Sequence, residues 1–553
     1  MGAARLGWVG VALAAMLWPG GARPAAGVET EAGNGVAGIV ASGRHPWLSQ
    51  PDLRDFAREL AELYPADQAR PIWFEGAQPA PALLSTVRAL GDAGRLGLDP
   101  ADLDADRLLE EARRSSAGQL PAPDRALLDV ALSVQWMRYL RAAHAGRIPM
   151  HRAGRGADLP DRPLDLPALV RTTRTGGDAA AVLASVEPRH PGYVRLKAAL
   201  ARQKLLAAAA PLPEVPLPAR KVEPGAEWEG IPALRARLSL LGDLPASSAP
   251  PQTANLYDPA LVAAVKRFQN RHLLGEDGVI GKGTVAAMNV PAVRRIRQIE
   301  LSLERWRWLP DPGRREVVVE LPRAEMWALD LERGTTDLHM RTVVGEAHSH
   351  ATPMIASSIT SVVFRPYWVP PPKILKEEIL PKAKADPAWL AGQNMEIVAR
   401  PEEGAEPIEP TEDVLAQVSK GELILRQRPG PRNSLGTVKF VVPDSQCIGL
   451  HGTPHKKTFD LPHRDRSHGC IRLEDPDALA RWVLVGEPGW DAARIAAASD
   501  ADTTTPVRLR EPVGVVLVYG TATVDPDGTE HYVDDLYHLD AQAEAELARQ
   551  RGR

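Results

Sequence analysis

The side chains that are best suited to take part in a reaction lie in a polar stretch towards the C-terminal end of the chain. His451 is followed by Gly452, and Cys470 stands 19 positions after His451, directly behind Gly469. A thiol becomes a nucleophile when it loses its proton, and a neighbouring imidazole can accept that proton. Glycine before the cysteine lets a substrate approach the backbone, and the amides around Cys470 could hold an oxyanion. The stretch predicts a cysteine nucleophile with a histidine base, provided that the chain folds back between them.

Two other interpretations of this stretch concern its histidines. Four of them share a segment of 20 residues with Cys470: His451, His455, His463 and His468. Such a cluster could bind a metal ion, but its spacing matches no familiar zinc pattern, and one cysteine among four histidines is unusual for structural zinc. The histidines could also be loop residues without a role.

A disulfide is the third alternative, since Cys447 and Cys470 are the only cysteines of the chain and an oxidising compartment would favour it. If the residues from Cys447 to His451 form a strand, these two lie roughly 13 Å apart at about 3.3 Å per residue. A Cys470 beside His451 would then be too far from Cys447, because bonded cysteines have Cα atoms within about 7 Å of each other. We therefore expect Cys470 to remain a reactive thiol.

The same stretch resembles the signature of the L,D-transpeptidases, which have a YkuD-type catalytic domain. The segments that carry the resemblance are His451-Gly452-Thr453 and Ser467-His468-Gly469-Cys470-Ile471-Arg472. Flanking segments resemble those of the large Gram-negative members: Trp306-Arg307-Trp308, Pro366-Tyr367-Trp368-Val369-Pro370, Leu425-Arg426-Gln427-Arg428-Pro429-Gly430 and Leu435-Gly436-Thr437-Val438-Lys439-Phe440. The resemblance covers about residues 50–540 and implies a β-rich catalytic fold.

The resemblance implies a role for each residue of the site. Cys470 is the expected nucleophile, His451 its general base, and the backbone carbonyl of Gly452 the group that orients the imidazole. The residues expected to form the oxyanion side and the substrate wall are Ser467, His468 and Gly469. No metal and no organic cofactor is implied.

Two neighbouring positions add detail to this site. Arg472 is the expected substrate contact, because its guanidinium fork suits a carboxylate, and the alternative is a structural ion pair with Glu474 or Asp475. Related enzymes often carry tyrosine two residues before the base, and Gly449 stands there in this chain. Any oxyanion or gating help from a hydroxyl at that place must be absent or come from elsewhere.

The implied reaction is transpeptidation of peptidoglycan. Cys470 would attack the carbonyl of the third stem residue, meso-diaminopimelate, in a donor tetrapeptide. D-alanine would leave, and an acceptor amine would convert the thioester into a 3→3 crosslink, with ping-pong kinetics. The expected partners are donor and acceptor stem tetrapeptides, with other cell-wall synthases as further candidates, and carbapenems are the expected inhibitors. The alternatives are an L,D-carboxypeptidase or crosslink hydrolase that uses water as acceptor, and a catalytically silent wall-binding scaffold.

A β-rich domain must position these residues. Its predicted strands are runs rich in β-branched residues between turns: Glu316–Leu321, Met326–Leu331, Leu338–Val344, Ser361–Phe364, Val438–Val442 and Val513–Tyr519. Residues 317–319 are all valine, which predicts a strand buried on both faces. The strand pattern breaks at about 371–431, and we expect an inserted helical cap there. The L,D-transpeptidase catalytic domain is expected at 313–525, before a C-terminal tail at 526–553.

Helical patterns dominate the first half of the chain. Residues 27–210 predict a helical scaffold domain, and Asp124 is a candidate N-cap of its clearest helix. A Pro-rich linker is expected at 211–226 and a connecting helix at 292–312. The chain as a whole is therefore expected to be a multidomain α+β protein.

Between the linker and the connecting helix, residues 227–291 predict a three-helix module. Asp258 is a good N-cap, with Pro259 at the first helical position. The run LVAAVKRFQNRHLLGEDGVIGKGTVAAMN resembles the peptidoglycan-binding module of cell-wall enzymes. The alternative is a generic three-helix unit.

The first residues predict export to the periplasm. Arg5 precedes 13 nonpolar residues, Leu6–Trp18, and small residues follow. This pattern is typical of a signal peptide, here at 1–26, and it is short of the roughly 20 residues that a membrane span needs. An uncleaved N-terminal tether is the alternative, and no later segment is apolar enough to span a bilayer. The net charge of -4 argues against a nucleic-acid binder, and two cysteines exclude a disulfide-dense scaffold.

Overall fold

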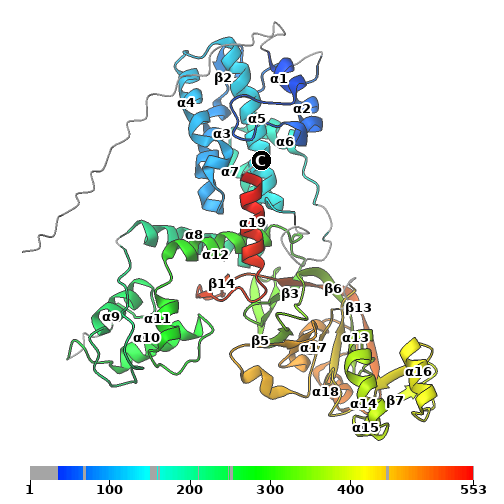
Figure 1. Cartoon of the computed structure of the whole chain (residues 1–553). Coiled ribbons are helices and arrows are strands. Elements are labelled where there is room, and N and C mark those ends of the chain that lie inside the picture. The colour runs from blue at the N-terminus through cyan, green and yellow to red at the C-terminus, as the bar shows by residue number, and fades with distance from the viewer. Residues whose placement is uncertain are drawn as a thin grey trace, which may run out of the picture.

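The computed structural model describes most of the chain (Figure 1). The described residues are 35–66, 70–149, 159, 162–209, 211–246, 248, 253–443 and 448–551. The predicted signal peptide at 1–26 and Cys447 lie outside them. Separate apolar cores belong to the N-terminal helices, to the three-helix module, to the cap and to the C-terminal sheet. None of the helices in the described part of the chain has the length and hydrophobicity that a bilayer crossing requires.

The N-terminal region is helical, as predicted. Its helices are α1 (Val36–Ser42), α2 (Ala57–Leu63), α3 (Pro81–Gly91), α4 (Ala105–Ser116), α5 (Ala122–Ala145), α6 (Leu166–Gly176) and α7 (Ala179–Val186), with a small hairpin of β1 (Phe74–Glu75) and β2 (Gln78–Pro79). The long α5 is buried on most of its surface. Pro121 occupies its N-cap, so the prediction of Asp124 as N-cap was wrong. Asp124 lies in the first turn instead, where a carboxylate is favoured by the helix dipole.

The three-helix module has its own apolar core, as predicted. Its helices are α9 (Ile231–Leu240), α10 (Pro259–Asn270) and α11 (Lys282–Met288). Asp258 caps α10, because its carboxylate accepts a hydrogen bond of 2.9 Å from the Leu261 amide. Leu261, Val265 and Phe268 follow at helical spacing and are fully buried.

Three helices join these regions to the sheet: α8 (Pro191–Ala208), α12 (Ala292–Trp306) and α19 (Leu539–Arg551). At the end of α12, the Trp306 ring lies 5.1 Å from the ring of His190. The carboxylate of Glu304 accepts a hydrogen bond of 2.8 Å from the Ile148 amide in the N-terminal region. The buried faces of α8 and α12 belong to the core of the sheet, so these two helices tie the N-terminal helices to the C-terminal region.

The C-terminal region is built on one large sheet. Its strands are β3 (Arg315–Glu320), β4 (Glu325–Asp330), β5 (Thr335–Gly345), β6 (Ile355–Phe364), β9 (Val438–Val441), β10 (Leu450–His451), β11 (Asp465–Ser467), β12 (Ile471–Leu473) and β13 (Thr505–Val518). Their order is β11-β5-β12-β10-β9-β6-β13-β3-β4, and β4 also pairs with the first half of β5, so the order closes on itself. The six predicted β-rich runs coincide with β3, β4, β5, β6, β9 and β13.

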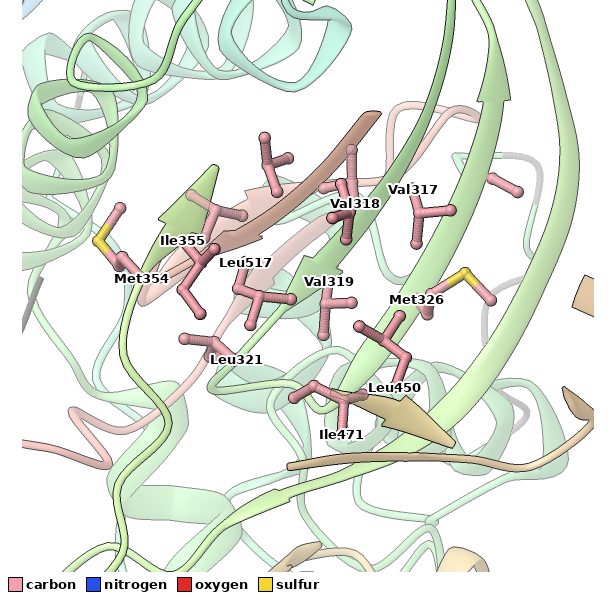
Figure 2. Close-up of a cluster of buried hydrophobic side chains, with 14 of the residues drawn as sticks. Val317, Val318, Val319, Leu321, Met326, Met354, Ile355, Leu450, Ile471 and Leu517 are labelled. Carbon is pink, nitrogen blue, oxygen red and sulfur yellow. The ribbon is translucent and has the colours of Figure 1, made fainter. Parts of the chain in front are cut away.

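The core of this sheet supports two of its short strands, β10 and β12 (Figure 2). Val317, Val318 and Val319 of β3 are all buried, which confirms the prediction of a strand covered on both faces. Leu450 of β10 and Ile471 of β12 point into the same cluster. Two helices that follow β12 complete the core on their buried sides: α17 (Pro476–Val483) and α18 (Ala492–Asp500).

The cap is an insertion between β6 and β9, as predicted. Its helices are α13 (Pro372–Ile374), a π-helical turn (Leu375–Ile379), α14 (Leu380–Ala385), α15 (Ala388–Gly392) and α16 (Glu412–Lys420). It also contains an antiparallel pair that was not predicted, β7 (Met395–Val398) and β8 (Ile424–Gln427). Beyond the sheet, β14 (Ala522–Val524) and β15 (Glu530–Tyr532) form a hairpin.

Candidate active site

The register of β10 against β12 brings the predicted nucleophile and base to one face of the sheet. The two strands are parallel, with Leu450 paired to Ile471 and His451 paired to Arg472. Alternate residues of a strand face opposite sides. Leu450 and Ile471 enter the core (Figure 2), so His451, Arg472 and the adjoining Cys470 share the other face. The half-buried Cys470 lies at the start of β12.

Backbone geometry fixes the tautomer of the His451 imidazole. Its Nδ1 lies 2.6 Å from the carbonyl oxygen of Gly452, which only accepts hydrogen bonds, so Nδ1 carries the proton. Nε2 is then the nitrogen that can accept a proton from a thiol. Burial lowers the pKa of His451 to about 4; the hydrogen bond to Gly452 opposes this, and the charges of Arg472 and Lys439 add to it. The imidazole is therefore neutral at neutral pH, as a base must be.

The turn before Cys470 is held by Ser467. The buried Ser467 hydroxyl donates to the carbonyl oxygen of Cys470 at 2.6 Å and accepts from the amide of Gly469 at 3.1 Å. Thr352 donates to the Gly469 carbonyl at 2.8 Å. Gly469 has a φ of +113°, and a Cβ there would lie 3.2 Å from Ile448, so both conformation and space favour glycine. Because the Gly469 amide already binds Ser467, the role of Gly469 here is to shape the turn.

Arg472 forms no ion pair within the described residues, in contrast to its acidic neighbours. Glu474 binds the guanidinium of Arg341, and Asp475 caps α17 through the Ala478 amide at 2.8 Å. Burial lowers the pKa of Arg472, and attraction to Cys470 works in the opposite direction. Arg472 is thus a cation close to Cys470 that forms no ion pair with a carboxylate of the described residues.

Lys439 is a second cation on this face, and the sequence analysis assigned it no role. It lies on β9, directly opposite His451 in the antiparallel pairing of β9 and β10. It is partly buried, and its charge reaches the imidazole, since it contributes to the lowered pKa of His451. Only the pairing of β9 with β10 reveals this position, because Lys439 precedes His451 by 12 residues and is not part of the motif around His451.

The side chain of His468 contacts the cap. Its Nε2 lies 2.7 Å from a carboxylate oxygen of Glu378, in the π-helical turn of the cap. Its ring is 4.4 Å from the ring of His350, whose Nε2 lies 3.1 Å from the Lys373 ammonium nitrogen. The cap therefore contacts the turn that carries the cysteine.

The remaining predictions for this stretch concern metal binding and the second cysteine. Within the described ranges, no group of three or more His, Cys, Asp or Glu side chains is arranged to hold a metal ion. His455 and His463 are exposed. Cys447 lies outside the described residues, so its separation from Cys470 stays a prediction.

Comparison with known proteins identifies the parts of the chain. Residues 314–490 match the model of the L,D-transpeptidase catalytic domain, residues 58–200 match a scaffold domain, and residues 229–288 match a "putative peptidoglycan binding domain". A "Putative L,D-transpeptidase" of Haemophilus influenzae is 32% identical over 249 residues, which are 44% of this chain and 48% of that protein. The chain thus spans about half the length of this relative.

Two solved structures are also similar to part of the chain. An L,D-transpeptidase from Xylanimonas cellulosilytica is 14% identical, with a TM-score of 0.17, and the match covers 55% of this chain and 99% of that one. A fused Zn-dependent amidase/peptidase/peptidoglycan-binding domain-containing protein from Clostridium acetobutylicum is 10% identical, with a TM-score of 0.14, and the match covers 54% and 99%.

The fold and the site define a multidomain α+β protein with a cysteine and a histidine on one face of a closed sheet. The chain carries one region that matches the L,D-transpeptidase catalytic domain and another that matches a putative peptidoglycan binding domain, in agreement with the predicted resemblance.

Proposed function

We propose that the protein forms 3→3 crosslinks in periplasmic peptidoglycan through a thioester on Cys470. The observation that supports the proposal is the register of β10 against β12: His451 is paired with Arg472, and Cys470, two residues before Arg472, is on the same face of the sheet. The neutral imidazole, with its proton fixed on Nδ1, supports a role as general base.

In the first half-reaction, Nε2 of His451 accepts the thiol proton while the sulfur of Cys470 attacks the carbonyl of the third stem residue. The protonated imidazole then gives its proton to the departing amine of D-alanine. A thioester to Cys470 remains. Because the carbonyl of Gly452 holds Nδ1–H throughout, the ring does not need to turn between the two proton transfers.

In the second half-reaction, the side-chain amine of an acceptor stem attacks the thioester. Neutral His451 accepts a proton from this amine and returns it to the sulfur as the thiolate leaves. The products are a new amide between two third-position residues and the regenerated thiol. Both half-reactions use the same two side chains, as ping-pong kinetics requires.

The cations of the site suit the anionic character of a donor peptide. Arg472 and Lys439 lie on the same face as His451, one on each neighbouring strand. Neither forms an ion pair within the described residues. A planar guanidinium binds a carboxylate through two parallel hydrogen bonds. We assign Arg472 to a carboxylate of the donor stem, with Lys439 as a second contact.

Analysis of products from purified disaccharide tetrapeptide tests the proposal. The wild type should release D-alanine and give a 3→3 dimer by mass spectrometry. Cys470→Ala should give neither, at unchanged melting temperature, whereas Cys447→Ala, the matched control, should retain activity. Tripeptide without dimer would instead indicate a carboxypeptidase. Loss of activity in EDTA with recovery in zinc would contradict the cysteine mechanism.

A further inference from the structure

The turn that carries Cys470 is held by two hydroxyl groups, and one of them comes from a distant part of the chain. Ser467, within the turn, binds the Gly469 amide and the Cys470 carbonyl, and Thr352 binds the Gly469 carbonyl at 2.8 Å. Glycine restrains its own backbone less than any other residue. Contacts such as these must therefore hold the turn at the observed φ of +113°.

The carbonyl of Gly469 controls the position of the cysteine that follows it. Because a peptide unit is planar, the Gly469 carbonyl lies in one plane with the amide and the Cα of Cys470. A hydrogen bond that fixes this carbonyl also fixes the direction in which the amide and the Cα leave the turn. Rotation of the plane would change the position of the sulfur relative to His451 on the neighbouring strand β10.

Thr352 is itself held in one orientation. Its buried Oγ1 accepts a hydrogen bond of 2.8 Å from the Gly345 amide, so its own proton is directed to the Gly469 carbonyl, which only accepts. Gly345 lies at the end of β5, where a Cβ would collide with the carbonyl oxygen of His350 and lie 2.9 Å from the threonine Oγ1. Any larger residue at this position would disturb the contact. The threonine is therefore a fixed support for the turn.

Tyr537 holds both Thr352 and its donor. The buried hydroxyl of Tyr537 donates to the Gly345 carbonyl at 2.8 Å and accepts from the Thr352 amide at 3.4 Å. Burial raises the pKa of Tyr537 to about 12, so the hydroxyl keeps its proton and stays a donor. Tyr519, directly after β13, accepts from the Tyr537 amide at 2.9 Å, and the two rings lie 5.5 Å apart. These contacts connect β13 to the nucleophile turn.

The place of Tyr537 in the chain was not expected to matter for the site. The sequence analysis assigned residues 526–553 to a C-terminal tail, and the match to the L,D-transpeptidase catalytic domain ends at residue 490. Tyr537 lies between β15 and α19 in this segment. One support of the nucleophile turn therefore comes from outside the matched region.

We propose that Thr352 and Tyr537 are positioning residues for the nucleophile: Thr352 holds the Gly469–Cys470 peptide, and Tyr537 holds Thr352. The proposal rests on the proposed function, because it takes Cys470 as the nucleophile. Both hydroxyls are engaged with backbone groups on their donor and acceptor sides. Their loss should therefore change the reactivity of the thiol and kcat, and leave KM for the donor peptide unchanged.

Removal of single hydroxyls from the full-length protein tests the role of Thr352. Thr352→Val keeps nearly the same shape and should slow the alkylation of Cys470 by iodoacetamide at pH 7 about 5-fold to 10-fold, as expected for the loss of one hydrogen bond. Thr352→Ser retains the hydroxyl and should react within about 2-fold of the wild type. The matched control is Thr173→Val, since the buried Thr173 likewise accepts from an N–H, of Trp136, and donates to a carbonyl, of Leu169. This control should lose stability with no change in the alkylation rate.

Tyr537→Phe tests the second support. It should slow alkylation about 2-fold to 5-fold, and it should add nothing in the Thr352→Val background, because both changes act through the same contact. Tyr257→Phe is the matched control, since the buried Tyr257 also donates to a glycine carbonyl, that of Gly278 at 2.6 Å. In dimer formation from soluble muropeptides, Thr352→Val and Tyr537→Phe should lower kcat at constant KM.

The outcomes separate this proposal from the catalytic one. Equal alkylation rates in Thr352→Val and Thr173→Val would overturn it. If Thr352→Val does not fold, the comparison of Tyr537→Phe with Tyr257→Phe decides in the same way. Additive losses in the double variant would overturn the role of Tyr537. Absence of dimer with every protein, the wild type included, would refute the proposed function, while the alkylation rates would still decide the positioning of the thiol.

Discussion

The acid limit of catalysis should be set by the buried imidazole of His451. Burial lowers its pKa from 6.5 to about 4, and a general base works only in its neutral form. At pH 5 about 90% of the imidazole is neutral with a pKa of about 4, against about 3% with the ordinary value. Between pH 7 and pH 5, kcat/KM should therefore fall by only about 10%, where an ordinary histidine would lose about 25-fold.

The rate of thioester formation on excess enzyme, followed by mass spectrometry from pH 4 to 8, measures this limit. Thiol with neutral imidazole and thiolate with imidazolium contain the same number of protons. The acid limb therefore reports protonation of the Cys470–His451 pair, whichever of the two forms reacts. A midpoint near pH 6.5 would refute the reasoning, because it would mean that burial does not govern the base.

A charge variant gives this experiment an internal control. Lys439 lies opposite His451, and its charge helps to lower the pKa of the imidazole. Lys439→Met should therefore move the acid limb to higher pH. Lys457→Met, which removes an exposed lysine outside this pairing, should leave the limb in place.

Three further expectations concern the thiol, the backbone of the base and the cap. A carbapenem should add one drug mass to non-reduced protein, on the peptide that contains Cys470 and not on Cys447; a mass two units low, restored by reductant, would contradict this. Gly436→Ala should lower the melting temperature and cut turnover. Gly436 has a φ of +66°, and a Cβ there would lie 2.8 Å from the carbonyl carbon of Gly452, whose oxygen orients the His451 imidazole. The cost of such strain is about 1–3 kcal/mol. Glu378→Gln should raise amide exchange in residues 373–380 about 2-fold to 5-fold, as expected for the weakening of one half-exposed hydrogen bond to His468, while Glu377→Gln should not; equal exchange in both would mean that the cap is held by other contacts.

The parts of the fold that the sequence could predict are those with a repeated pattern. Runs of β-branched residues identified six strands of the sheet, and the cap between β6 and β9 was predicted because that pattern breaks. The short strands that carry the site were harder to predict: β10 was considered only as part of a longer strand from Cys447 to His451, and β12 was not predicted; β10 has two residues and β12 has three. Two or three residues are too few to show a period, and pairing with neighbouring strands alone makes them strands.

The residues of the candidate site also fall into those that the sequence could predict and those that it could not. Residue types and spacing were enough to single out Cys470 and His451, since few side chains can serve as nucleophile and base. Lys439 and the contact of His468 with Glu378 could not be predicted, because each depends on the meeting of distant segments. Motif analysis therefore proposes the reacting atoms, while the charges around them follow from register and packing.

The two cations of the site connect substrate binding to the strength of the base. Arg472 and Lys439 each lower the pKa of His451 in the free protein. A donor carboxylate bound between them would neutralise their charge and so make the imidazole a stronger base only when substrate is present. The acid limb of the single-turnover rate at saturating donor, which reports the complex, should then lie at higher pH than the limb of kcat/KM, by up to about one unit. In Arg472→Met the two limbs should lie closer together, because only the charge of Lys439 is then left for the carboxylate to neutralise. Coincident limbs in the wild type would show that the donor carboxylate binds elsewhere and that the cations serve the free site alone.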